Sequence, residues 1–87
     1  MSRVFADSKK RLELLYRLQR RGFKVRLHSY EYFVRDQGFV TILVLYPAEG
    51  VATLRRIPWN REASEKAASV ISGLLKEMDP SLVVQVG

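Results

Sequence analysis

The chain has 87 residues, 47% of them hydrophobic, and it contains no cysteine. This length suits one small domain over residues 1–87, and the lack of cysteine excludes disulfides, thiolate metal sites and thiol redox chemistry. Fifteen Lys and Arg outnumber nine Asp and Glu, for a net charge of +6. All of this excess lies in residues 1–37, which hold ten cations and four acids. A basic half on a small domain is typical of proteins that bind polyanions, most often nucleic acids.

A first helix is expected from about residue 8 to residue 21. Asp7 or Ser8 can cap its start, and Gly22 can supply the left-handed stop. Leu12, Leu14, Leu15 and Leu18, with Gln19, give it a core-facing stripe. The rest of the helix surface is cationic: Lys9, Lys10, Arg11, Arg17, Arg20 and Arg21. The first three oppose the helix dipole, so folding alone would not favour them there. Residues 1–6 either form a brief strand or pack against this helix.

Residues 23–35 alternate between apolar and polar side chains, which predicts one long strand. One face of this strand would carry Phe23, Val25, Leu27 and Phe33. The other would carry cations and aromatic rings: Lys24, Arg26, His28, Tyr30 and Tyr32. A turn at 36–38, a strand at 39–46, a turn at 47–50 and a strand at 51–57 complete an antiparallel meander. Arg55 and Arg56 are adjacent on the last strand, so they point to opposite faces.

The strand at 39–46 is apolar on both faces and should lie centrally in the sheet. One face would carry Val40, Ile42, Val44 and Tyr46, and the other Phe39, Thr41, Leu43 and Leu45. Both sets need cover. Either the monomer packs both faces, or one of them lies against a second subunit or a partner protein.

A second helix is expected between a cap at Asn60 and the stop at Asp79–Pro80. Its outer face is mixed in charge, and its buried stripe would comprise Ala63, Ala67, Val70, Ile71, Leu74, Leu75 and Met78. Residues 82–86 are apolar enough for a last strand at a sheet edge. The predicted class is therefore α+β, in the order α-β-β-β-α-β. The two helices would pack on one face of an antiparallel sheet of three to four strands.

The α-β-β-β-α order and the Ala-rich segment 62–68 resemble the double-stranded-RNA-binding domain. That family places a lysine cluster at the start of its second helix. Here the matching region offers only Arg61 and Lys66 against Glu62 and Glu65. The residues that would grip duplex RNA are thus missing, and the final strand has no place in that fold. If Val4–Phe5 formed a strand, the order of elements would instead approach the ferredoxin-like order βαββαβ with one added strand.

The basic helix and the basic strand face together predict a non-enzymatic nucleic-acid-binding module, for DNA or RNA. Cations attract phosphates, and neighbouring rings can stack on bases. The predicted phosphate contacts are Lys9, Lys10, Arg17, Arg20, Arg21, Lys24 and Arg26, and the predicted stacking rings are Tyr30 and Tyr32. A purely structural explanation also fits the strand, because exposed strands favour Tyr, and Lys and Arg block edge pairing.

An alternative is a protein-interaction module, such as an inhibitor or adaptor from a phage or mobile element, that docks on an acidic partner. The apolar central strand or Trp59 would anchor it, although Trp59 is more simply a staple over the second helix. A ribonuclease using His28 lacks a second acid–base group at a telling spacing. We therefore expect no catalytic residue, metal or cofactor. No apolar run is long enough to span a membrane, and a cytoplasmic location is the default.

Overall fold

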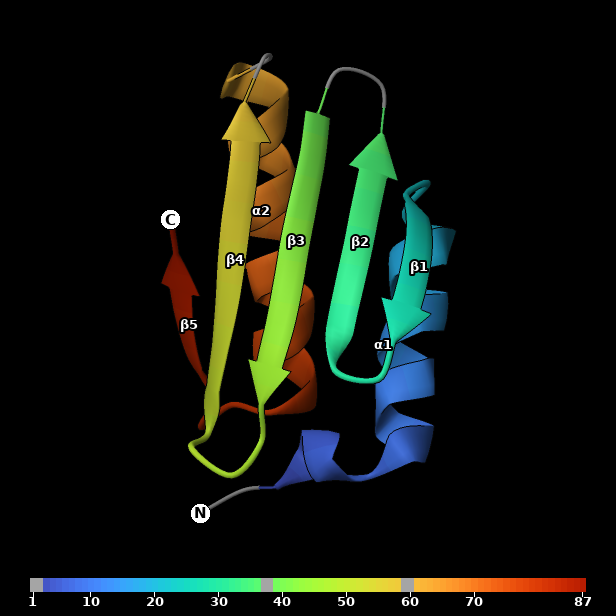
Figure 1. The fold of residues 1–87 in the computed structure, drawn as a ribbon, viewed down its shortest axis with the longest axis vertical. Coiled ribbons are helices and arrows are strands. Elements are labelled where there is room, and N and C mark those ends of the chain that lie inside the picture. Colours follow the sequence, from blue (N-terminus) through green and yellow to red (C-terminus); the bar gives the residue numbers. More distant parts are fainter. Residues whose placement is uncertain (1–2, 37–38, 59–60) are drawn as a thin grey trace.

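The computed structural model describes residues 3–36, 39–58 and 61–87, which form a five-stranded sheet with two helices on one of its faces (Figure 1). The elements in chain order are the 3₁₀ helix Val4–Ala6, α1 (Ser8–Arg20), β1 (Lys24–His28), β2 (Glu31–Asp36), β3 (Phe39–Tyr46), β4 (Val51–Pro58), α2 (Arg61–Met78) and β5 (Val83–Val86). The strands lie in sequence order. Strands β1 to β4 are antiparallel, whereas β5 runs parallel to β4.

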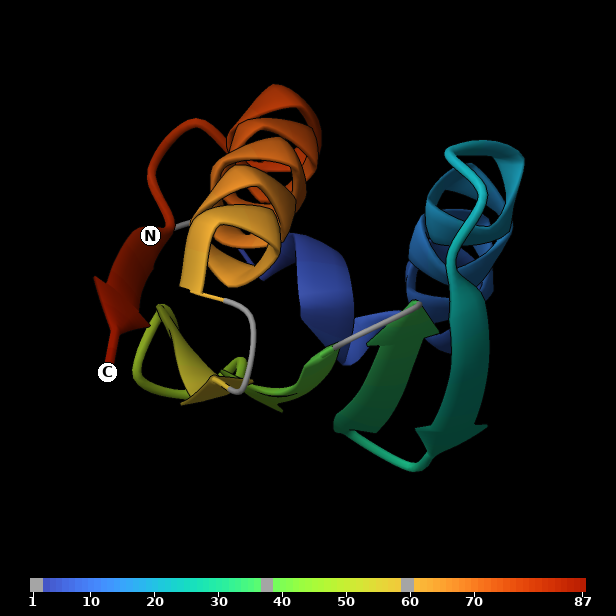
Figure 2. The same ribbon diagram turned by 90° about the horizontal axis from the view of Figure 1, so that it is seen from above.

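This architecture confirms the predicted α+β class and the packing of both helices on one face of the sheet (Figure 2). Two details of the prediction were wrong: the sheet has five strands rather than three or four, and it is mixed rather than antiparallel. Four strands separate the helices, so the order resembling the double-stranded-RNA-binding domain does not hold. Val4–Ala6 is a 3₁₀ helix, which removes the ferredoxin-like order as well.

The ends of α1 follow the predicted local chemistry. The side chain of Asp7 accepts a hydrogen bond from the backbone N–H of Lys9 at 2.9 Å, as an N-cap does. Gly22 has a φ of +92°, the left-handed conformation that ends a helix at little cost to glycine. The expected cap Asn60 and the expected staple Trp59 lie outside the described residues.

The predicted strand over residues 23–35 was wrong, because it is a hairpin. The chain reverses at Ser29 and Tyr30, where Ser29 has a φ of +59°. Paired residues of antiparallel strands point to the same face, so Tyr32 joins Leu27 and Phe33 joins Arg26. An unbroken strand would have done the opposite. The reversal buries Tyr32 among the core residues and places Phe33 on the face away from the helices.

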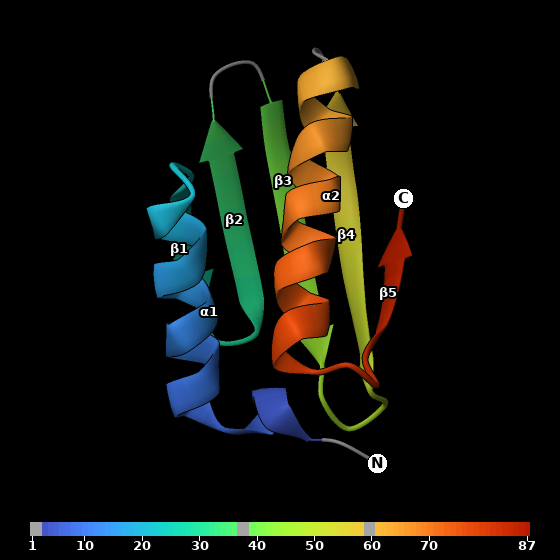
Figure 3. The same cartoon turned by 180° about the vertical axis from the view of Figure 1, so that it is seen from behind.

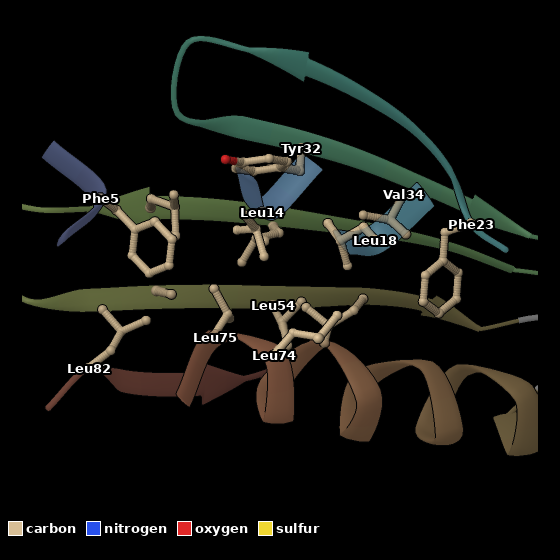
Figure 4. Packing of buried hydrophobic residues seen from close by; sticks show 14 of the residues in the cluster. Phe5, Leu14, Leu18, Phe23, Tyr32, Val34, Leu54, Leu74, Leu75 and Leu82 are labelled. Atoms are coloured by element: carbon tan, nitrogen blue, oxygen red, sulfur yellow. The ribbon is translucent and has the colours of Figure 1, made fainter. Parts of the chain in front are cut away.

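The core lies between the sheet and the two helices (Figure 4). Its fully buried members come from every layer, and the largest are Phe5, Leu14, Leu18, Tyr32, Leu43, Leu54, Ile71, Leu75 and Leu82. The predicted stripe of α2 is confirmed, with Ser64 and Ala68 buried beside it. The stripe of α1 is rotated from the prediction, because Leu14 and Leu18 are buried whereas Leu12 and Gln19 are exposed.

In the part of the chain that the structure describes, no helix combines the length and the apolar character needed to cross a membrane. The last strand, β5, lies at one edge of the sheet as predicted, and β1 forms the other edge. Arg55 and Arg56 do point to opposite faces. Arg56 lies on the helix side and donates to the carbonyl of Gly87 at 3.2 Å, whereas Arg55 faces away from the helices.

Candidate nucleic-acid interface

One face of the sheet carries no helix, and we call it the open face. It is turned toward the viewer in Figure 1, whereas Figure 3 shows the helices covering the other side. The pairing register assigns to the open face the following described side chains: Lys24, Arg26, His28, Glu31, Phe33, Arg35, Ile42, Val44, Tyr46, Val51, Thr53, Arg55, Ile57, Val83 and Gln85. This face is therefore part cationic and part apolar.

Four cations define the charge of the open face: Lys24, Arg26, Arg35 and Arg55. Lys24 is paired with Arg35, so two like charges sit side by side at one end of β1 and β2. Glu31 is the single acid assigned to this face among the described side chains, and it lies beside His28. For residues 3–36, 39–58 and 61–87, the structure shows no ion pair to any of the four cations.

One row of cross-strand partners runs from Arg26 through Phe33 and Ile42 to Arg55. The phenyl ring and the aliphatic side chain thus lie between two guanidinium groups. Strands in a sheet are spaced by about 4.8 Å, so the Cα atoms at the ends of this row are about 14 Å apart. Phe33 is 38% exposed, so its phenyl ring is accessible to a ligand on this face.

The cations of α1 lie on the other side of the sheet, and those at its C-terminal end are next to α2. Glu13 bridges two of them, since its carboxylate lies 3.6 Å from Lys10 Nζ and 3.0 Å from Arg17 Nη2. Arg17 Nη1 is also 3.5 Å from Glu77 of α2. Arg17, Arg20 and Arg21 line a groove between the two helices together with Glu13, Leu74 and Glu77. Lys9 is exposed near the start of the helix. The two predicted basic surfaces therefore do not form one surface.

Neither tyrosine predicted to stack on bases belongs to the open face. The hydroxyl of Tyr32 is inside the core and donates to the backbone carbonyl of Arg11 at 2.7 Å. Burial raises the pKa of this hydroxyl above its usual range, and the nearby Arg11 charge opposes that rise only in part. Tyr30 lies in the turn, where the Arg11 guanidinium sits 4.3 Å from its ring centroid.

Arg11 has a structural role beside the turn between β1 and β2. Its guanidinium donates to the carbonyls of Phe5 at 2.8 Å and Ala6 at 3.1 Å. The same side chain covers the ring of Tyr30, so that ring and that cation are already engaged with each other. Tyr32 is therefore not accessible for stacking on a base, because it is buried in the core. The ring of Tyr30 is already in contact with Arg11.

The open face brings together Lys24 and Arg26 from the predicted set and adds three residues that the sequence did not assign to it. Phe33 and Arg35 were missed because the turn reverses the alternation along the chain. The sequence showed that only one of Arg55 and Arg56 could share this face, since adjacent residues on a strand point to opposite faces, but not which one. His28 lies beside Glu31, and no cluster of metal-binding side chains occurs within the described ranges.

Comparison with known proteins finds no match for this chain among protein-family models, curated proteins or solved structures.

Proposed function

We propose that this chain is a nucleic-acid-binding module that contacts phosphates through its open sheet face. The observation that carries the proposal is the group of four cations on that face without an ion pair among the described residues. Like charges placed together cost free energy unless an anion or counterions neutralise them. A polyanion gains affinity by releasing its own condensed counterions to such a surface.

The cations of α1 support the same proposal less strongly. Lys10 and Arg17 already have acidic partners, which leaves Lys9, Arg20 and Arg21 as the contributors from this helix. These three can attract a polyanion over a distance. Tyr16, which is 53% exposed, lies on the same helix face as Lys9 and Arg20. The helix therefore offers one ring beside two cations, whereas the open face joins its cations to an apolar surface that spans several strands.

A protein-interaction module is the second candidate, and the exposed apolar side chains of the open face favour it. Phe33, Tyr46, Ile57 and Val83 are all exposed there. A symmetric contact of this face with a second copy would gather eight cations in one interface, which like-charge repulsion disfavours. An acidic protein is therefore the partner that this alternative requires.

Two variants with equal net charge test which surface binds. The sheet variant combines Lys24→Gln, Arg26→Gln, Arg35→Gln and Arg55→Gln, and its matched control combines Lys9→Gln, Lys10→Gln, Arg20→Gln and Arg21→Gln. Fluorescence anisotropy with labelled single-stranded and duplex 12-mers measures the dissociation constants at several salt concentrations. The logarithm of the association constant falls linearly with the logarithm of the salt concentration, and each phosphate contact with a single strand adds about 0.7 to the steepness of that fall. We expect the slope to fall by about 3 in the sheet variant, with a loss of affinity of at least about 30-fold at low salt.

The control should lose only a few fold in affinity, because it removes attraction but not contacts. Equal losses in the two variants would show that net charge acts without a defined surface. If the wild-type chain binds neither oligonucleotide at low salt, the proposed function is wrong. Capture of one stoichiometric acidic protein by the same face would then support the alternative.

A further inference from the structure

We infer that the ligand of the open face is a single strand of RNA or DNA, one of whose bases stacks on Phe33 between Arg26 and Arg55. This inference rests on the proposed function and narrows it to one class of nucleic acid. It follows from three features of the open face: the exposed phenyl ring, the apolar side chains around it and the curvature of the sheet.

The phenyl ring of Phe33 contributes nothing to a contact made only of phosphates. It has no hydrogen-bond donor and no charge. A phosphate placed over it would therefore lose bound water without gaining a hydrogen bond or an ion pair. A nucleobase does gain from such a ring, because every base has a π-face that can stack on it. The row partner Arg26 is placed beside the ring, where its guanidinium can reach the phosphate that flanks a stacked base.

The neighbours of Phe33 extend the apolar surface toward β4. Ile42 and Val44 are half-buried on the open face, and Tyr46 and Ile57 are exposed on the same side. Bases of a duplex are stacked on one another and present only their edges in the grooves. Bases of a single strand can lie flat on a surface of this kind. The mixture of apolar centre and cations at both ends of the row therefore fits a strand with unpaired bases.

The shape of the sheet points the same way. Figure 2 shows that the sheet curves around the helices, so the open face is on its convex side. A broad convex surface and the cylinder of a duplex touch along a narrow strip, and five strands side by side are wider than a groove. A flexible single strand can follow the curved face across several strands. The row from Arg26 to Arg55, about 14 Å long, is the span of a few nucleotides.

Charge argues against two other occupants that an apolar sheet face could have, a second copy and an apolar protein surface. A second copy would double the number of cations in the interface, since it brings its own Lys24, Arg26, Arg35 and Arg55. An apolar protein surface would leave the same four cations buried and unpaired, at a high cost. A single-stranded polyanion neutralises the cations and covers the ring in one contact.

The decisive experiment compares four labelled 12-mers at one low salt concentration: the single strands U12, dT12 and an abasic strand, which have equal phosphate numbers, and a mixed-sequence duplex, which has twice as many phosphates. The proteins are the wild type, Phe33→Ala, Phe33→Trp and the control Tyr16→Ala, which removes a ring that is 53% exposed on α1. Stacking on an aromatic side chain contributes about 5- to 150-fold in affinity per base. We expect wild type to prefer single strands to the duplex and the abasic strand, and Phe33→Ala to remove this preference. Phe33→Trp should restore it, and Tyr16→Ala should have no effect.

The outcomes separate the two proposals. If wild type binds the abasic strand and the duplex as tightly as U12 and dT12, and Phe33→Ala changes nothing, the inference is wrong while phosphate binding stands. If none of the four probes binds at low salt, the proposed function fails and the inference fails with it. A dimer in light scattering that dissociates in Phe33→Ala would show that a second copy covers the ring, which also overturns the inference.

Circular dichroism checks folding, and Phe33→Leu provides an apolar replacement without a flat ring. A difference between U12 and an added dU12 probe, which differ only at the 2′ position, would show which sugar the face accepts.

Discussion

The two faces of the sheet are both rich in apolar side chains, yet the fold uses them differently. On β3, Leu43 is fully buried under the helices, whereas its neighbour Ile42 is only half-buried on the open face. On the helix side, the buried hydroxyl of Tyr32 is tied to a backbone carbonyl. On the open side, four cations have no ion pair among the described residues. The side chains that the core does not need are therefore concentrated on one face, and they are the candidates for function.

The largest effect that tests this comparison is on the free energy of unfolding. Leu43→Ala removes a fully buried side chain and should cost about 2–5 kcal/mol, from reduced burial and the cavity left behind. Ile42→Ala, one residue away on the open face, should cost about 1 kcal/mol or less, because its side chain is already partly in water. Urea unfolding followed by circular dichroism measures both. Equal costs would mean that the open face is covered in solution, contrary to the comparison.

Tyr32→Phe should cost about 1 kcal/mol of stability, because it removes one buried hydrogen bond while keeping the ring. The lost hydrogen bond lies on the helix side of the sheet and does not touch the open face, so binding of single-stranded oligonucleotides should be unchanged. Phe33→Ala is the opposite case, with a small loss of stability and a large loss of binding. Urea unfolding measures the stability of the two variants, and fluorescence anisotropy measures their binding. If Tyr32→Phe also weakened binding, the two faces of the sheet would not be independent.

The same tyrosine predicts how stability changes at alkaline pH. Burial raises the pKa of Tyr32 in the folded chain, so the hydroxyl stays neutral there while the unfolded chain ionises above about pH 10. Its contribution is therefore complete below about pH 10 and is lost as the pH rises further. The urea midpoint of wild type should fall more between pH 8 and pH 10.5 than that of Tyr32→Phe. Parallel curves would contradict the buried, neutral hydroxyl.

Most of the fold could be predicted because its determinants are local. Asp7 and Gly22 bound α1, the apolar residues of α2 recur at helical spacing, and the run at 39–46 is too apolar for any position but the sheet interior. The hairpin could not be predicted, because its turn lacks glycine, asparagine and proline. Ser29 adopts a left-handed conformation that its own chemistry does not favour, and the surrounding strands hold it there.

The candidate site was only partly predictable for the same reason. An alternating pattern has a period of two, so one unrecognised turn exchanged the positions of Tyr32 and Phe33. The ion pair of Arg17 with Glu77 joins residues that are 60 positions apart, and no local pattern reveals it. Lys24 and Arg26 precede the turn, and their assignment to a cationic face away from the core holds.

Ser29→Gly tests whether the turn stores strain. Glycine adopts a φ near +59° without a steric penalty, although it loses more entropy on folding than serine. The left-handed conformation costs a residue with a Cβ about 1–2 kcal/mol, so the net gain in stability should be about 0.5–1 kcal/mol. Thermal and urea unfolding measure it. The control is Ser69→Gly, the same substitution at an exposed position of α2, which should lower stability because glycine disfavours a helix. A loss of stability in Ser29→Gly would show that the serine side chain makes a compensating contact.

The smallest effect separates the two groups of cations. Arg17→Gln removes contacts with Glu13 and Glu77 and should cost about 0.5 kcal/mol, because exposed ion pairs contribute little, and the cost should vanish in about 1 M salt. Arg26→Gln should cost nothing and should raise stability slightly at low salt, since it lies near Lys24 and Arg35 and has no acidic partner among the described residues. Unfolding in low and high salt gives the sign of each change. A cost for Arg26→Gln equal to that for Arg17→Gln would mean that the fold itself uses the cations of the open face, and the argument for a polyanionic ligand would lose its basis.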